Sequence, residues 1–267
     1  MNSMENYFEN RLGVAMYTIH KSTAADMHGT FMKLHAQGYQ GVEFYGGMDF
    51  DTVLVNRSLR DAELKLTGWH TEWADLQDDT FDRTLRILKE TGCPVAVIPC
   101  LGGQWNVGHG PEEECRETWL RHFEKMEEVR KKLAAEGIRT AYHNHSHEFE
   151  LSYDGKSLFE FIFDTLSKDF IIEFDSGNCI EGGGDPAYIL EKYKDRDMIL
   201  HLKPYSKARG FNTWLNAPDD ENNWKQILDL KNKKYLWMLV ESENKVLDEF
   251  ENSRRCMEGF KAASAVF

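Results

Sequence analysis

The feature that most constrains the fold is a short apolar segment that recurs eight times, separated in most cases by helix-like stretches. Apolar residues on both faces are expected of strands that are buried on both sides. Strands that alternate with helices indicate a parallel sheet. The predicted strands are Leu12–Thr18, Gly41–Tyr45, Leu64–His70, Pro94–Pro99, Ile138–His143, Phe170–Phe174, Met198–Leu202 and Tyr235–Val240.

The intervening segments carry helical spacing and helix-end signals. A glycine ends three of them, at Gly38, Gly92 and Gly137, and Asp185-Pro186 is a typical helix start, with Asp as N-cap and Pro in the first turn. The predicted helices are Thr23–Gln37, Phe81–Lys89, Pro111–Glu136, Lys156–Leu166, one opened by Asp185-Pro186, Trp224–Leu230, and one from Lys245 onward.

Eight such units predict an α/β fold, a (β/α)8 TIM barrel that forms one domain over residues 1–267. A doubly wound open sheet is the alternative. That fold usually shows a glycine-rich turn after its first strand, and this sequence has none there.

Composition and charge exclude several classes of protein. The 267 residues carry a formal net charge of −13, which disfavours binding to nucleic acid. The five cysteines form no CxxC pair, so we expect reduced thiols in a cytoplasmic enzyme rather than a disulfide framework. The first residues resemble no signal peptide, and no apolar stretch approaches the length of a membrane span. A small molecule is therefore the expected partner.

Polar side chains collect at the ends of the predicted strands, where the active site of a TIM barrel lies. Charged groups at the ends of buried strands are costly unless they are paired or bind a metal ion. Carboxylates mixed with imidazoles suit a divalent ion, namely Mn²⁺, Zn²⁺, Co²⁺, Fe²⁺ or Mg²⁺. The alternative is a polar rim with no chemistry. The residues concerned are Glu43, Tyr45, His70, His143, Asn144, His145, Glu173, Asp175, His201, Lys203, Glu241 and Glu243.

Five segments together resemble the sugar phosphate isomerase/epimerase family of xylose isomerase-like TIM barrels. They are GYQGVEFYG (38–46), YHNHSHEFE (142–150), EFDSGNCIEGGGDP (173–186), RDMILHLKPYS (196–206) and LVESE (239–243). The resemblance implies one metal ion, for which manganese is favoured, held by Glu, Asp, His and Glu at the ends of strands five to eight. It also implies a carbohydrate substrate.

Asp175, His201 and Glu241 match the last three of these ligands. The fifth strand departs from the family, because histidines stand where many members have glutamate. Glu148 is the preferred substitute, since it preserves the ligand charge, and His143 or His145 is the alternative. His147 is expected to face solvent.

Family members commonly isomerise or epimerise ketoses by removing a proton next to a carbonyl, through an enediolate. The resemblance implies catalytic roles among Glu148, Glu241, His143, His145 and Lys203. The expected substrate contacts are Glu43, Tyr45, His70, Asn144, Arg209 and Trp214, and aromatic residues near Trp105 offer further stacking surfaces.

Three alternatives stay open at the level of the sequence. A lyase or dehydratase acting on keto-sugars or keto-glycosides would use the same proton abstraction. A non-catalytic sugar-binding barrel would keep the pocket without the chemistry. A homo-oligomer, or a partner subunit that completes the pocket, is also compatible with the sequence.

Overall fold

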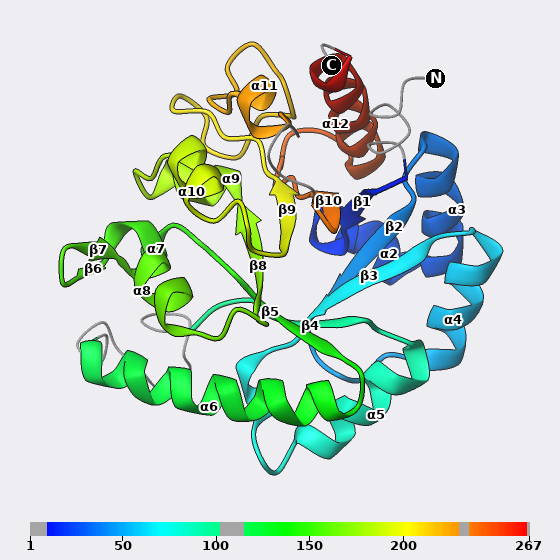
Figure 1. Cartoon of the computed structure of the whole chain (residues 1–267). Helices are drawn as coiled ribbons and strands as arrows, with labels where there is room; N and C mark the ends of the chain where they lie inside the picture. The colour runs from blue at the N-terminus through cyan, green and yellow to red at the C-terminus, as the bar shows by residue number, and fades with distance from the viewer. Residues whose placement is uncertain (1–9, 102–114, 230–234, 266–267) are drawn as a thin grey trace.

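The computed structural model describes residues 10–101, 115–229 and 235–265 and contains a closed barrel of parallel strands. The first strand pairs with the second on one side and with the last on the other. This architecture confirms the predicted TIM barrel (Figure 1). In barrel order the strands are β1 (Leu12–Ala15), β10 (Trp237–Val240), β9 (Met198–Leu202), β8 (Ile171–Asp175), β5 (Arg139–His143), β4 (Val95–Ile98), β3 (Lys65–His70) and β2 (Gly41–Tyr45).

Helices surround the barrel, as the outer ring in Figure 1 shows. The longer helices are α3 (Met27–Gln37), α4 (Thr52–Asp61), α5 (Phe81–Thr91), α6 (Arg116–Ala135), α8 (Leu158–Thr165) and α12 (Glu249–Ser264). The shorter elements are η1 (Met16–Ile19), α2 (His20–Ala25), η2 (Trp73–Leu76), α7 (His147–Glu150), α9 (Ser176–Glu181), α10 (Pro186–Lys192), α11 (Trp224–Ile227) and a hairpin of β6 (Ser152–Tyr153) and β7 (Lys156–Ser157).

Helix caps explain where the structure differs from the predicted segments. The expected helix over Thr23–Gln37 is divided into α2 and α3, because the side chain of Asp26 accepts a hydrogen bond from the backbone N–H of Gly29 and starts a new helix. Helix α4 was not predicted, and Asp51 caps it in the same way.

The ends of two predicted elements also differ. The strand expected over Leu12–Thr18 ends at Ala15 and continues as the 3₁₀ helix η1. The helix expected from Lys245 begins at Glu249, after the N-cap Asp248. Pro111, the expected start of the long helix, and Trp105 lie outside the described residues.

The core has two apolar layers, one between the barrel and its helices and one inside the barrel. Alternate strand residues face opposite sides, so Ile172 and Phe174 pack in the outer layer while Ile171 belongs to the inner one. We call the inner layer the apolar floor. It consists of Val95, Val97, Ala141, Ile171, Ile199 and Leu239.

Polar residues stand directly above this floor. Two positions beyond Ala141, Ile171, Ile199 and Leu239, the strands carry His143, Glu173, His201 and Glu241. Because the strand period is two, these side chains face the barrel interior at the carboxyl ends of the strands. Within the described part of the chain, no helix has the length and apolar character needed to cross a membrane.

Candidate active site

Four side chains from neighbouring strands converge at the carboxyl end of the barrel. They are His143 on β5, Asp175 on β8, His201 on β9 and Glu241 directly after β10, and we call them the upper group. One nitrogen or oxygen atom of each lies within 4.8 Å of the others, and all four residues are buried. Two carboxylates and two imidazoles are a donor set that divalent metal ions accept.

Lys203 is buried beside the upper group and lies close to three carboxylates, two of that group and Glu243. Its Nζ lies 2.9 Å from Oε1 of Glu241, 3.8 Å from Oδ2 of Asp175 and 2.6 Å from Oε1 of Glu243. Burial alone would lower the pKa of Lys203, but these carboxylates outweigh it and raise the pKa above its usual range. The lysine is therefore a fixed cation.

Two asparagines hold Asp175 in place. The backbone N–H of Asp175 donates to Oδ1 of Asn144 at 2.9 Å, and the backbone N–H of Asn178 donates to Oδ1 of Asp175 at 2.7 Å. The buried Oδ2 has no hydrogen-bond partner among the described residues. Such an unsatisfied oxygen is costly unless something binds it, so Asp175 fits the role of a metal ligand.

Asn144 was expected to contact substrate, but its amide binds the neighbouring strand. Besides accepting from Asp175, it donates from Nδ2 to the backbone oxygen of Asp175 at 3.2 Å. The asparagines of the HNH and DSGN segments thus join the ends of β5 and β8.

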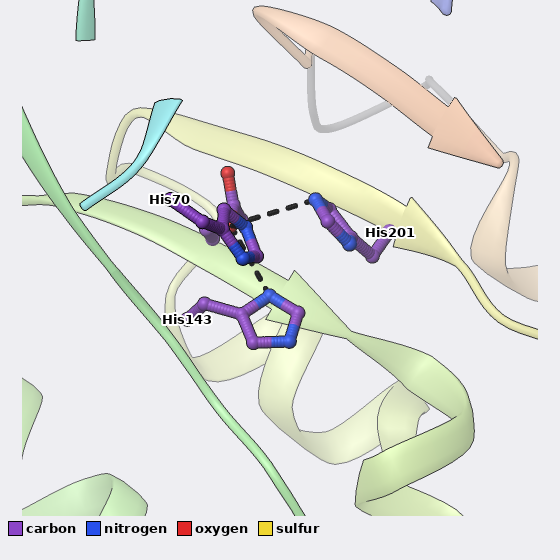
Figure 2. A group of neighbouring side chains, drawn as sticks. His70, His143 and His201 are labelled. Carbon is purple, nitrogen blue, oxygen red and sulfur yellow. Dashed lines mark hydrogen bonds and ion pairs between the residues drawn. The ribbon is translucent and has the colours of Figure 1, made fainter. Parts of the chain in front are cut away.

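A second set of side chains lies around Glu173, next to the upper group. We call Glu43, His70 and Glu173 the lower group. Nε2 of His70 lies 2.7 Å from Oε2 of Glu173 and 3.1 Å from Oε2 of Glu43. Figure 2 shows that His70, His143 and His201 lie close together. Their ring centroids are 4.6 to 5.5 Å apart, and only the rings of His70 and His201 are stacked.

The two histidines nearest Glu173 differ in charge. Burial alone would lower the pKa of His70, but the carboxylates of Glu43 and Glu173 outweigh it and raise the pKa to about 10. Burial lowers the pKa of His143 to about 4, despite its hydrogen bond to Glu173. At neutral pH the site therefore contains a cationic His70 and a neutral His143, and a neutral imidazole is the form that binds metals.

A cavity of about 260 Å³ opens beside these groups. Tyr17 and Tyr45 line it with their rings in an edge-to-face arrangement, 5.4 Å between centroids. Its polar lining comprises Glu43, His70, His143, His145, Glu241 and Glu243. Sequence reasoning missed Tyr17, which lies two residues beyond the end of β1, although the rule that the site lies at strand ends would have found it.

Glu148 lies apart from the upper group. Its carboxylate is fully buried, accepts a hydrogen bond of 2.6 Å from the hydroxyl of Tyr142, and accepts another of 2.8 Å from the backbone N–H of His145. Because of these two hydrogen bonds, the carboxylate of Glu148 points back toward the turn after β5. In the position expected for Glu148, the structure brings His143 beside Asp175, His201 and Glu241.

His147 does not face solvent, and that expectation was wrong. Its side chain is 13 % exposed, Nδ1 lies 3.2 Å from Oε2 of Glu148, and Nε2 hydrogen-bonds the backbone oxygen of Leu101 at 3.0 Å. The ring therefore joins the turn after β5 to the end of the segment after β4.

Arg209 and Trp214 were expected to contact substrate, and the structure does not bring either to the cavity lining. Arg209 forms a two-pronged pair with Asp219, with nitrogen–oxygen distances of 2.7 and 2.6 Å. Its guanidinium lies 5.7 Å from the ring centre of Trp214, and that of Arg255 lies 4.7 Å from the same centre. These contacts stabilise the loop itself.

Comparison with known proteins places this site in a familiar fold. The chain is 26% identical to inosose dehydratase from Geobacillus kaustophilus (strain HTA426) over 132 residues, which cover 46% of this chain and 42% of that protein. A sugar phosphate isomerase/epimerase from Parabacteroides distasonis ATCC 8503 superposes with a TM-score of 0.77 at 20% identity, over 96% of this chain and 94% of the other.

A third structure, a xylose isomerase-like TIM barrel protein from Mycobacterium smegmatis in complex with magnesium, has a TM-score of 0.66 at 13% identity, over 100% of this chain and 98% of the other. The family model of the xylose isomerase-like TIM barrel matches residues 31–262. The chain therefore belongs to the xylose isomerase-like TIM barrel family.

Proposed function

We propose that the protein is a divalent-metal-dependent isomerase or epimerase of a sugar or related polyol. The observation that supports this most strongly is the upper group, in which two imidazoles and two carboxylates converge although all four are buried. The donor set fits Mn²⁺ and also Mg²⁺, Zn²⁺, Co²⁺ and Fe²⁺, and we retain manganese as the favoured ion.

The upper group would hold the ion, with His143 in the place first expected for Glu148. The unsatisfied Oδ2 of Asp175 supports this assignment. A divalent ion bound there supplies a Lewis acid that polarises a carbonyl oxygen and stabilises the negative charge that develops on it.

Proton transfer would fall to groups that line the cavity. Burial and the neighbouring His143 and Lys203 lower the pKa of His145 well below its usual range, so this imidazole is neutral at pH 7, and the same shift makes it a weaker base. Glu241 and Glu243 also line the cavity, where Lys203 holds both carboxylates. We assign the removal of the proton next to the carbonyl to His145 or one of these carboxylates.

The substrate would lie against Tyr17 and Tyr45, whose rings suit stacking on the apolar face of a sugar. Glu43 can accept hydrogen bonds from hydroxyl groups of a substrate in the cavity, and His70 can donate hydrogen bonds to them.

A second candidate function is a dehydratase or another lyase acting on keto-sugars. The match with inosose dehydratase favours it, and it uses the same first step. If a leaving group stands β to the carbon that loses its proton, water or an alcohol is expelled instead of a proton being returned.

The test combines metal analysis with isotope exchange. The purified protein should contain about one divalent ion per chain, and Asp175→Asn and Glu241→Gln should lose it, whereas the surface control Asp197→Asn should retain it. In D₂O, a panel of ketoses and keto-inositols should take up deuterium next to the carbonyl. Exchange with a new stereoisomer indicates an epimerase, and exchange with loss of water indicates a dehydratase. A metal-loaded protein that exchanges no carbon-bound proton would favour a binding barrel.

A further inference from the structure

Glu173 is a fully buried carboxylate that stands directly above the apolar floor. It follows Ile171 by two residues on β8, and its side chain is 0 % exposed. Removing an ionised carboxylate from water costs several kcal/mol unless hydrogen bonds and opposite charge compensate for it. The groups that surround Glu173 therefore indicate why a carboxylate is stable there.

Those groups are imidazoles. Oε2 of Glu173 lies 2.7 Å from Nε2 of His70, 3.1 Å from Nδ1 of His143 and 3.4 Å from Nε2 of His201. Every ion pair that Glu173 makes with the described residues is to a histidine. Three histidines thus have a nitrogen facing one oxygen atom.

The hydrogen bond to His143 has a definite direction. An ionised carboxylate can only accept hydrogen bonds, so Nδ1 of His143 must carry the hydrogen. A neutral imidazole has a hydrogen on one nitrogen only, so Nε2 keeps its lone pair. That atom lies 4.0 Å from Oδ2 of Asp175, on the side of the upper group.

From this geometry we infer that Glu173 is a positioning residue, which fixes the tautomer and the ring orientation of His143 so that Nε2 is presented to the metal ion. The inference rests on the proposed metal-dependent function. A ligand histidine whose second nitrogen donates to a carboxylate is a more basic and better oriented ligand, and loss of such a carboxylate typically weakens metal binding 10- to 100-fold.

A competing interpretation is that the histidines around Glu173 form a second metal site. His70, His143, Glu173 and His201 also offer one atom each within 4.8 Å of the others. However, this set shares His143 and His201 with the upper group. A metal ion bound among the histidines around Glu173 would be coordinated by Nδ1 of His143, which is the nitrogen that donates its hydrogen to Glu173. We therefore expect one ion per chain rather than two.

The test compares the metal-free wild type with Glu173→Gln, which keeps the shape of the side chain and removes its charge, and with the surface control Asp197→Asn. Calorimetric titration with Mn²⁺ gives the stoichiometry and the Kd. The ¹⁵N shifts of the imidazoles, assigned with His143→Asn, report the tautomer of His143 without any metal. We expect one ion in all three proteins, a Kd 10 to 100 times higher in Glu173→Gln alone, and Nδ1–H on His143 in the wild type.

Each other result has a distinct meaning. Two ions in the wild type and one in Glu173→Gln would show that the histidines around Glu173 form a second metal site. An unchanged Kd in Glu173→Gln, or a hydrogen on Nε2 of His143 in the wild type, would overturn the role of Glu173 alone. A wild type that binds no Mn²⁺ would overturn the proposed function, and the role of Glu173 with it. The wild-type spectrum decides the tautomer even if Glu173→Gln does not fold.

Discussion

The hydroxyl of Tyr142 donates a 2.6 Å hydrogen bond to Oε1 of Glu148, and both side chains are fully buried. The second oxygen of Glu148 accepts from the backbone N–H of His145 at 2.8 Å. Burial raises the pKa of Glu148, and these hydrogen bonds only partly oppose it. The carboxylate therefore fixes the turn that carries His145 into the cavity lining.

We predict that Glu148→Gln keeps its metal ion and loses stability. The amide of glutamine has one oxygen, so it can accept only one of these two hydrogen bonds and one buried donor loses its partner. The free energy of unfolding should therefore fall by about 1–3 kcal/mol. Tyr142→Phe should behave similarly, because it removes one of the same bonds. Denaturant titration and elemental analysis measure the two effects. A folded Glu148→Gln protein without metal would identify Glu148 as the strand-five ligand.

Lys203→Met should destabilise the metal-free protein strongly. The substitution preserves much of the side-chain volume and leaves Glu241 and Glu243 without their cation, so the free energy of unfolding should fall by about 3–5 kcal/mol. A bound divalent ion would replace part of the lost charge, and Mn²⁺ should therefore raise the melting temperature of the variant more than that of the wild type. Equal shifts in both proteins would show that Lys203 and the ion do not compensate for each other.

Glu160 gives a pH-dependent prediction away from the cavity. It forms a capping box with Ser157 at the start of α8 and pairs with Lys192 at 2.7 Å. Burial alone would raise its pKa, but hydrogen bonds from Lys192, Tyr188 and Ser157 outweigh it and lower the pKa to about 2. The ionised form is therefore favoured in the folded state. Its contribution is fully present above the unfolded pKa of about 4.3 and is lost as the pH falls through about 2.

Accordingly, Glu160→Ala should lower the free energy of unfolding by about 1 kcal/mol at pH 7. The difference from the wild type should shrink between pH 4 and pH 2. Denaturant titrations at several pH values check this, with the exposed Glu191→Ala as control. A difference that stays constant as the pH falls would show that the ionised carboxylate is not what stabilises the helix.

Gly177 allows α9 to approach β9 closely. A Cβ at this position would lie 2.5 Å from the backbone oxygen of Lys203 and 2.9 Å from its Cβ. Gly177→Ala should therefore displace β9 or α9 and lower the melting temperature, with a loss of about 1–3 kcal/mol. Gly183→Ala is a useful comparison, because space is open there and only its positive φ is strained. An unchanged melting temperature for Gly177→Ala would indicate that the two elements separate easily.

Strand periodicity predicted which side chains come together at the rim of the barrel. Asp175, His201 and Glu241 were expected there because each stands at the end of an apolar strand and parallel strands in register bring their carboxyl ends to one rim, and the structure brings the three together. Their role as metal ligands stays a prediction. The caps Gly92 and Asp185 were predicted correctly for a similar reason, since each acts within one helical turn.

The placements that differ from expectation lie in turns and loops, where no period fixes the direction of a side chain. Glu148 and His147 stand in the short helix α7, and Arg209 stands in the loop after β9. Their partners, Tyr142, Leu101 and Asp219, could not be inferred from spacing along the chain. Glu173 was visible as a strand residue, but its role depends on three histidines that only the closed barrel brings together.

The pairing of β1 with β10 has a consequence for how the chain matures. While the polypeptide is being synthesised, β1 can pair with β2 early, but its other edge stays open until the last strand has left the ribosome. Asp175, His201 and Glu241 also come late in the chain, so the proposed metal ion could not protect the growing sheet. Chaperone dependence and self-association should therefore be greatest for nascent chains that end just before Trp237.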